Sequence, residues 1–162
     1  MMNMVLDMLL GGIKMKELTN KKSNSLTIIA GCGRLGASFA NTLSDQEENV
    51  LVIDRDKDSF RKLSPSFGGL TLAGDATDID VLHEAQIEKA SVVIAVTDND
   101  NTNIMIAQMA KELFKKERVI ARLNDPDKEC VYYNSGIDTI CPVVLSIKEI
   151  SKLIKTKNVR EE

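Results

Sequence analysis

A short apolar run near the start of the chain passes directly into a glycine motif. Residues 26–30 are Leu-Thr-Ile-Ile-Ala, and Gly31, Gly33 and Gly36 follow with the spacing Gly-x-Gly-x-x-Gly. In a turn between a strand and a helix, the first glycine permits a sharp bend, the second leaves room for a phosphate, and the third lets the helix pack closely on the strand. The motif therefore predicts a strand, a tight turn and a helix whose N-terminus faces an anion.

A second apolar run ends in a carboxylate. Residues 49–53 are Asn-Val-Leu-Val-Ile, and Asp54 follows them. An acidic residue at this place, roughly 20 residues after the glycine motif, can accept both hydroxyl groups of a ribose and repels a 2′-phosphate. We expect Asp54 to bind a ribose, although Arg55 beside it weakens the argument against a 2′-phosphate. A solvated residue at a strand end is the alternative.

Strand and helix patterns alternate along the rest of the chain. Apolar runs such as residues 92–96, Val-Val-Ile-Ala-Val, are typical of strands that are covered on both faces. The alternation predicts an α/β fold, a Rossmann-like doubly wound parallel sheet of six strands. The expected strands are residues 26–30, 49–53, 69–73, 91–96, 118–122 and 138–140, and the expected helices after the first are residues 56–63, 78–85, 101–116 and 125–133.

A further helical pattern follows the last expected strand. Val143, Ile147 and Ile150 recur at helical spacing there. Because no further strand remains for this helix to cover, we expect a crossover helix that packs on another subunit in a homo-oligomer. Met105 widens the apolar stripe of the expected helix 101–116, which either packs deeply on the sheet or adds to a self-association face.

Three segments are expected along the chain. They are an N-terminal tail over residues 1–24, a nucleotide-binding domain over residues 25–141, and an oligomerisation helix with a C-terminal tail over residues 142–162. The apolar start of the chain contains Asp7 and a Gly11-Gly12 break, and it falls short of the ~20 residues of a membrane span. It is either a tail that follows a misplaced start codon or a short amphipathic helix that docks on a partner or a membrane surface.

The composition narrows the function classes. The net charge of −3 and the pI near 5.3 give no general electrostatic reason to bind nucleic acid. Three widely separated cysteines and a single histidine, His83, predict neither a disulfide framework nor a metal site and fit a reducing cytoplasm. No catalytic residue is predicted, because an oxidoreductase needs an acid or base besides its cofactor site and the chain has no Tyr-x-x-x-Lys. An NAD-dependent oxidoreductase and a soluble nucleotide-binding scaffold remain the alternatives.

Polar residues follow the predicted strands at the edge where a doubly wound sheet binds its ligand. Ligands of such sheets lie outside the carboxyl ends of the strands, where the strand order reverses. The residues expected to bind a cofactor are Gly31, Cys32, Gly33, Arg34, Leu35, Gly36, Asp54, Arg55, Asp75, Ala76, Thr77, Thr97, Asp98, Asn99 and Arg122.

Several of these segments, in this order, match one family. The segments are Gly-Cys-Gly-Arg-Leu-Gly at 31–36, Asp54, Gly-Asp-Ala-Thr at 74–77, the Asp- and Asn-rich loop at 97–103, and Val-Ile-Ala-Arg at 119–122. Residues 26–154 thereby resemble the nucleotide-binding N-terminal domain of potassium-transport regulators, the RCK or KTN fold (TrkA N-terminal-like). The glycine motif alone does not separate this family from dehydrogenases, whereas the segments at 74–77 and 97–103 are more specific.

The resemblance implies an adenine nucleotide (NAD, NADH, ATP, ADP or AMP) as the ligand and a non-enzymatic regulatory role. It also implies a cytoplasmic protein at the inner face of the membrane, with a potassium channel or transporter subunit as partner. Phosphate would be held by Gly31, Gly33, Arg34 and Gly36, the ribose by Asp54 and Arg55, the adenine edge by Asp75 and Ala76, and the rest of the ligand by Thr97 and Asp98. Family members often carry a second ligand-binding subdomain, so the chain is either a single-domain member or a piece of a longer system.

Four of these side chains keep a second interpretation. Arg34 binds phosphate or is a free surface arginine, and Asp75 contacts adenine or only caps a turn. Arg122 contacts the ligand or pairs with an acidic residue. Cys32 is a small buried residue or, at a helix N-terminus, a reactive thiol. His83 is expected to be structural.

Overall fold

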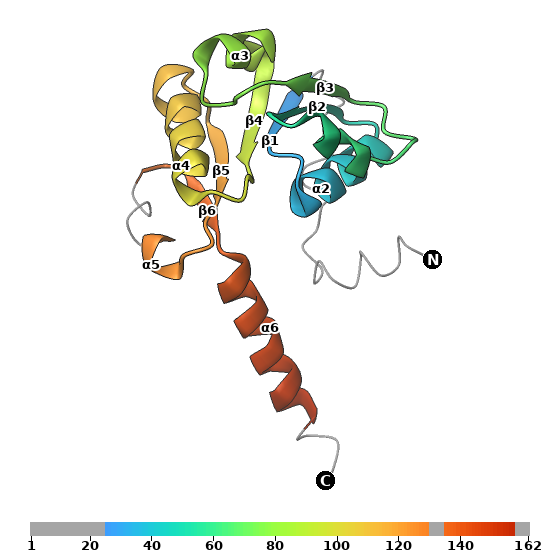
Figure 1. Ribbon diagram of the computed structural model, residues 1–162. Coiled ribbons are helices and arrows are strands. Elements are labelled where there is room, and N and C mark those ends of the chain that lie inside the picture. The colour runs from blue at the N-terminus through green and yellow to red at the C-terminus, as the bar shows by residue number, and fades with distance from the viewer. Residues whose placement is uncertain (1–24, 130–134, 158–162) are drawn as a thin grey trace.

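The sheet of this protein is fully parallel. The computed structural model describes residues 25–129 and 135–157. Its strands are β1 (Leu26–Ala30), β2 (Asn49–Asp54), β3 (Leu70–Ala73), β4 (Ala90–Ala95), β5 (Arg118–Arg122) and β6 (Asp138–Ile140). Their order across the sheet is β3-β2-β1-β4-β5-β6 (Figure 1), and all neighbouring strands are parallel. The expected doubly wound α/β fold is confirmed, and the strand order reverses between β1 and β4.

Helical segments connect the strands. They are α2 (Arg34–Asp45), η2 (Lys57–Lys62), α3 (Ile79–Glu84), η3 (Ile87–Lys89), α4 (Asp100–Gln108), η4 (Met109–Leu113), α5 (Pro126–Glu129) and α6 (Pro142–Lys157). Most expected elements are present with shifts of one or two residues at their ends. Of the expected helix 125–133, only α5 is described, and residues 130–134 lie outside the described residues, as does the N-terminal tail 1–24.

Two expected α-helices have a different geometry. Residues 57–62 form a 3₁₀ helix, in which the N–H of Ser59 donates to the carbonyl of Asp56 at 3.0 Å. Such tight turns are typical of short connectors. The expected helix 101–116 is α-helical only in α4 and continues as the π-helical η4, where the N–H of Phe114 donates to the carbonyl of Met109, five residues earlier, at 3.2 Å. The described helix ends at Leu113, three residues before the expected end at residue 116.

The core consists of two layers, one on each face of the sheet. Ile28 packs in one layer with Ile104 of α4, and its neighbour Ile29 packs in the other layer with Ala37 of α2. Successive strand residues point to opposite faces, and both isoleucines are completely buried. This arrangement explains why the central strands are continuously apolar rather than alternating.

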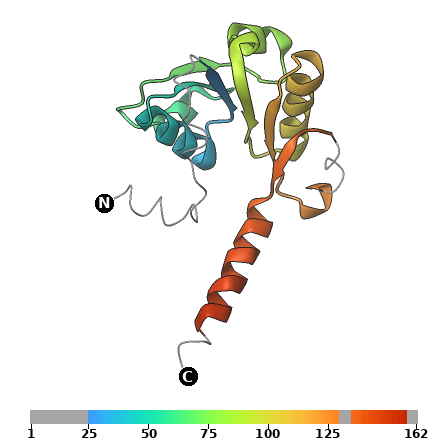
Figure 2. The same cartoon turned by 180° about the vertical axis from the view of Figure 1, so that it is seen from behind.

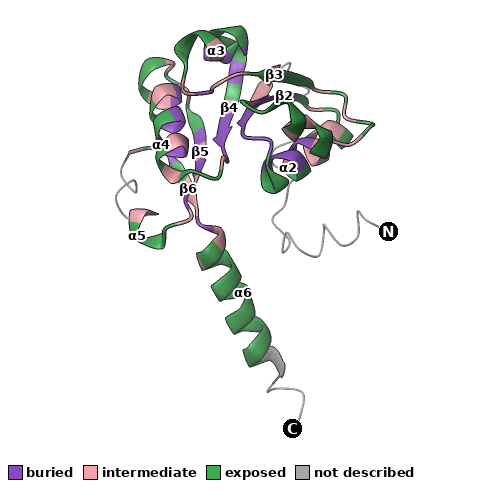
Figure 3. Cartoon of the chain, viewed as in Figure 1, coloured by how far each residue is buried: buried purple, intermediate pink, exposed green. Residues whose placement is uncertain are grey.

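The last helix, α6, leaves the domain. Figures 1 and 2 show it projecting away from the sheet, and Figure 3 shows it exposed along nearly all of its described length. Its large apolar residues are between 46% and 61% exposed; they are Val143, Leu145, Ile147, Ile150, Leu153 and Ile154. The expected helix is therefore present, while its packing on another subunit stays a prediction. Within the described residues, no helix has both the length and the apolar character needed to span a bilayer.

Candidate functional site

A groove of about 730 Å³ opens at the carboxyl ends of the strands. The glycine turn after β1 and the ends of β2 and β4 line it, together with residues of β5, β6 and the first turn of α6. It therefore lies where the strand order reverses, which is the position expected for a ligand of a doubly wound sheet.

The three glycines of the turn after β1 have different roles. Gly31 has a φ of +108°, and a Cβ atom there would lie 2.8 Å from the backbone nitrogen of Thr97. A Cβ at Gly36 would lie 1.9 Å from the carbonyl oxygen of Gly31, whereas a Cβ at Gly33 would meet no atom within 4 Å. The fold therefore requires the first and third glycines, while the second glycine faces open space in the groove.

Among the described residues, no side chain caps the start of α2. Gly33 is the N-cap residue, it makes no side-chain capping bond, and the first turn contains no acidic residue. The first N–H groups of a helix lack partners within the helix and form the positive end of its dipole. Arg34 is exposed here and makes no hydrogen bond or ion pair with the described part of the chain. This arrangement suits an anionic ligand.

The carboxylate of Asp54 joins the end of β2 to the glycine turn. Its Oδ2 atom accepts the N–H of Cys32 at 2.6 Å, and its Oδ1 atom accepts the N–H of Asp56 at 2.9 Å. Each carboxylate oxygen keeps a further lone pair. Asp54 can therefore hold the turn in place and still accept hydroxyl groups from a ligand in the groove.

Asp75 is held in its ionised form at another wall of the groove. Its Oδ1 atom accepts the hydroxyl of Thr77 at 2.7 Å and the N–H of the same residue at 2.9 Å, and Arg55 lies 3.7 Å from Oδ2. The Thr77 hydrogen bonds, that from the hydroxyl first, outweigh partial burial and, with Arg55, lower the pKa of Asp75. Asp75 thus caps a turn and also lines the groove; its contact with adenine stays a prediction.

A fully buried asparagine fixes the loop after β4. The Oδ1 atom of Asn103 accepts the N–H of Thr97 at 2.8 Å and its hydroxyl at 2.7 Å. The Nδ2 atom of Asn103 donates to the carbonyls of Thr97 at 3.0 Å and Arg122 at 2.9 Å. The amide therefore joins the ends of β4 and β5, and it uses both of its donors and its oxygen to do so.

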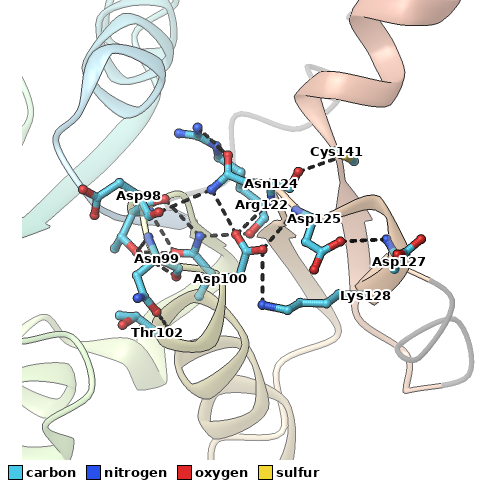
Figure 4. A network of polar contacts seen from close by, with 12 residues as sticks. Asp98, Asn99, Asp100, Thr102, Arg122, Asn124, Asp125, Asp127, Lys128 and Cys141 are labelled. Atoms are coloured by element: carbon cyan, nitrogen blue, oxygen red, sulfur yellow. Dashed lines mark hydrogen bonds and ion pairs between the residues drawn. The ribbon is translucent and has the colours of Figure 1, made fainter.

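Arg122 is bound by a neutral side chain. Its Nε and Nη2 atoms donate to Oδ1 of Asn124 at 3.1 and 2.7 Å (Figure 4). Among the described residues it forms no ion pair with a carboxylate, so that alternative is not observed there. The guanidinium lines the groove without an ion-pair partner among the described residues.

The groove brings together most of the residues expected from the sequence. Those lining it are Gly31, Gly33, Arg34, Leu35, Asp54, Arg55, Asp75, Ala76, Thr97, Asp98 and Arg122. The others support the groove from behind: Cys32 and Gly36 are buried, Thr77 orients Asp75, and the Asn99 side chain accepts the N–H of Thr102 to cap α4. Their role as direct ligand contacts is not supported by this geometry.

Several residues that line the groove were not expected from the sequence. They are Ile53, Ser59, Lys62, Val96, Thr102, Ile140, Pro142 and Leu145. Lys62 and Ser59 come from η2, and Pro142 and Leu145 come from α6. A positive charge soon after Asp54 was a possible signal for Lys62, whereas the position of α6 residues depends on the direction in which the helix leaves β6.

Two reactive residue types outside the groove are structural. Cys32 is completely buried, and this burial raises the pKa of its thiol, with the nearby Asp54 carboxylate adding to the effect and Lys62 opposing it. Burial and the raised pKa favour the interpretation of Cys32 as a small buried residue. His83 pairs with Glu88 through Nδ1 and packs edge-on against the ring of Phe114.

The sequence and the fold match a known family. A family model described as the TrkA-N domain matches residues 27–142. The Trk system potassium uptake protein TrkA of Streptomyces coelicolor is 47% identical over 116 residues, which cover 72% of this chain and 52% of that protein. The TrkA homolog of Pyrococcus horikoshii is 32% identical over 125 residues, covering 76% and 55%. The chain thus spans about half the length of these relatives.

Solved structures give the same match. The RCK domain of GsuK superposes with a TM-score of 0.72 at 27% identity, covering 86% of this chain and 30% of that one. A crystal structure of GsuK bound to ADP superposes with a TM-score of 0.70 at 28% identity, covering 83% of this chain and 35% of that one.

Proposed function

The chain belongs to the TrkA-N domain family, and on that premise we propose that it binds an adenine nucleotide in the groove and regulates potassium transport without catalysing a reaction. One observation carries the proposal. The uncapped start of α2 and the open side of Gly33 face the groove. Three cations line the same groove and form no ion pair within the described residues: Arg34, Lys62 and Arg122. A phosphate-bearing ligand supplies the anion that this arrangement lacks.

The chemical groups of an adenine nucleotide match the side chains on the different walls of the groove. In the proposed complex, Asp54 accepts the ribose hydroxyls, the start of α2 and Arg34 hold phosphate, and Asp75 and Ala76 border the adenine. The related GsuK structure is described as bound to ADP, which supports this ligand class. The proposal covers NAD, NADH, ATP, ADP and AMP, since all of them carry adenosine and phosphate.

The proposed assembly uses α6. Its exposed apolar side chains pack against a second copy of this chain, which removes a surface that a soluble monomer rarely leaves open. The relatives are named as potassium uptake proteins, which supports a membrane channel or transporter as the further partner. The chain then acts on the cytoplasmic side of the membrane.

The first turn of α6 forms part of the wall of the ligand groove. Pro142 and Leu145 belong to the first turn of α6 and line the groove. A nucleotide that prefers one orientation of α6 shifts the equilibrium between orientations by its differential affinity. A tenfold preference corresponds to about 1.4 kcal/mol per site, and several sites in one assembly add to this bias.

Binding is tested by calorimetry of the purified chain with AMP, ADP, ATP, NAD and NADH, together with mass spectrometry of nucleotide retained through purification. We expect at least one of these ligands to bind. If none binds at millimolar concentration, the proposed ligand class is wrong. Regulation is tested with the reconstituted transporter, where ion flux that is the same with every bound nucleotide contradicts the regulatory role.

Assembly is tested by sedimentation at micromolar concentration. Ile150→Asp places a charge on the apolar face of α6 and should shift the chain toward monomer. Ser151→Asp adds the same charge at an exposed polar position of that helix and is the matched control. A wild-type chain that sediments as a monomer contradicts the proposed interface.

A further inference from the structure

A polar network outside the glycine turn holds one groove cation in place. Arg122 ends β5 and lines the groove, and two of its N–H groups donate to the same oxygen, Oδ1 of Asn124, at 3.1 and 2.7 Å. Figure 4 shows this pair at one end of a chain of contacts that runs from Arg122 through Asn124 to Asp100 and Lys128.

The orientation of the Asn124 amide is fixed by chemistry. Its Nδ2 atom donates to Oδ1 of Asp100 at 3.0 Å and to the carbonyl oxygen of Asp98 at 3.3 Å. Both partners only accept hydrogen bonds and Arg122 only donates them. The amide nitrogen must therefore face Asp100, and the amide oxygen must face Arg122.

Asp100 anchors the network. Its Oδ1 atom also accepts the backbone N–H of Asn124 at 2.8 Å, and its Oδ2 atom accepts the N–H of Asp125 at 3.1 Å and lies 3.6 Å from Nζ of Lys128. Only 9% of its side chain is exposed. Burial alone would raise the pKa of Asp100, but these hydrogen bonds and Lys128 outweigh burial and lower it. Asp100 is therefore an ionised anchor at neutral pH.

Because the partner of Arg122 is a neutral amide, it does not neutralise the charge of the guanidinium. A carboxylate in the place of Asn124 would hold the guanidinium equally well but would cancel its charge. The amide oxygen binds two of the five N–H groups of Arg122 and leaves three available. Arg122 thus presents a full positive charge in a fixed position, which is the arrangement that binds phosphate most strongly.

We propose that Asn124 and Asp100 are positioning residues for Arg122, and that the positioned Arg122 makes the groove prefer ligands with more phosphate charge. The inference deepens the proposed function and rests on it. Asp54 serves the ribose, which every candidate ligand contains, whereas Arg122 lies on another strand and meets the part of the ligand that varies. Discrimination among nucleotides therefore depends on the network of Asn124, while basal adenosine binding does not.

The test measures affinities for AMP, ADP and ATP by calorimetry at one ionic strength, and its readout is the ratio of the ATP affinity to the AMP affinity. We expect Arg122→Gln to lower this ratio about tenfold, since one charge-assisted phosphate contact is lost. Asn124→Ala should lower the ratio about threefold or more, because the affinity for ATP falls further than the affinity for AMP. The double variant should resemble Arg122→Gln alone, because Asn124 acts through Arg122.

Two further variants separate positioning from stability. Asn124→Asp has nearly the same shape but faces Asp100 with a second carboxylate and cancels the charge of Arg122, so the ratio should fall here too. Lys128→Met removes a contact of Asp100 on the side away from Arg122, and the ratio should stay at the wild-type value. Lys128→Met is therefore the matched control for a general disturbance of the network.

Each outcome decides the inference. If both Asn124 variants weaken AMP and ATP equally, the network is only structural and the inference fails. If Arg122→Gln binds with the wild-type ratio, the inference fails while the proposed function stands. If the wild-type chain binds none of the three nucleotides, the proposed function and the inference fail together.

Discussion

Two alanine substitutions in the same motif should separate folding from ligand binding. At Gly36 the new methyl group would lie 1.9 Å from the carbonyl oxygen of Gly31. Because the obstacle is backbone in a packed turn, the helix must move, and we expect Gly36→Ala to lower the free energy of unfolding by about 3 kcal/mol or more.

At Gly33 the protein itself offers no obstacle. The backbone is extended, with φ at −74° and ψ at −172°, and no atom lies within 4 Å of the added Cβ. Alanine is a poorer N-cap than glycine by roughly 1 kcal/mol, while it restricts the unfolded chain by a similar amount of about 0.4–1 kcal/mol. Gly33→Ala should therefore change the free energy of unfolding by less than about 1 kcal/mol. Its methyl group occupies space in the groove, so nucleotide affinity should fall about tenfold or more.

Urea unfolding followed by circular dichroism measures the first quantity, and calorimetry with the tightest-binding nucleotide measures the second. Gly36→Ala serves as the folding control for Gly33→Ala. The reasoning is refuted if Gly33→Ala binds like the wild type, because phosphate then does not approach that backbone. It is also refuted if the two variants are equally destabilised.

Three other predictions follow from single side chains. Asp54→Ala should weaken binding of AMP and NAD alike by about 1.5–3 kcal/mol in calorimetry, and unchanged affinity would remove Asp54 from the site. Asp100 has a folded pKa below its unfolded value, so the stability that its ionised form contributes is complete above about pH 4 and is lost as the pH falls through the folded pKa. The difference in urea midpoint between the wild type and Asp100→Asn should therefore shrink from pH 7 to pH 3. A difference that stays constant over this range would contradict the prediction. Cys32 should resist thiol reagents at pH 7 in the folded chain and react in urea, and fast modification of the folded chain would show that the turn opens.

The strands and the glycine turn were predictable because local patterns determine them. A run such as residues 92–96 is apolar on both faces only if both faces are covered, and Val93 and Ile94 lie in opposite core layers. The spacing of Gly31, Gly33 and Gly36 also predicted the groove, because the fold requires Gly31 and Gly36 and leaves Gly33 open to the groove. The type of helix was less predictable, because the π turn at η4 depends on one extra residue that periodicity does not reveal.

The network around Arg122 was not predictable for a different reason. Asp100 and Asn124 are 24 positions apart, and they meet only because β4 and β5 are neighbours and both end at the same edge of the sheet. From the sequence alone, a charged arginine at a strand end is equally consistent with an ion pair and with a ligand contact. The hydrogen bonds of the Asn124 amide show no ion pair of Arg122 within the described residues, and they come from two segments, the end of β5 and residues 98–100 between β4 and the start of α4.

The glycine turn is held by close backbone contacts and Arg122 by side-chain hydrogen bonds, so the two regions should differ in how well they tolerate substitution. A Cβ atom at Gly31 or Gly36 would lie 2.8 or 1.9 Å from backbone atoms. We therefore expect substitutions there to destabilise the fold before they affect ligand binding. Arg122 is held by side chains that belong to neither core layer, so we expect their substitution to disturb the core less. If the proposed function holds, we expect ligand preference to change through residues 122 and 124 without loss of the fold, and binding of any nucleotide to depend on the glycine turn.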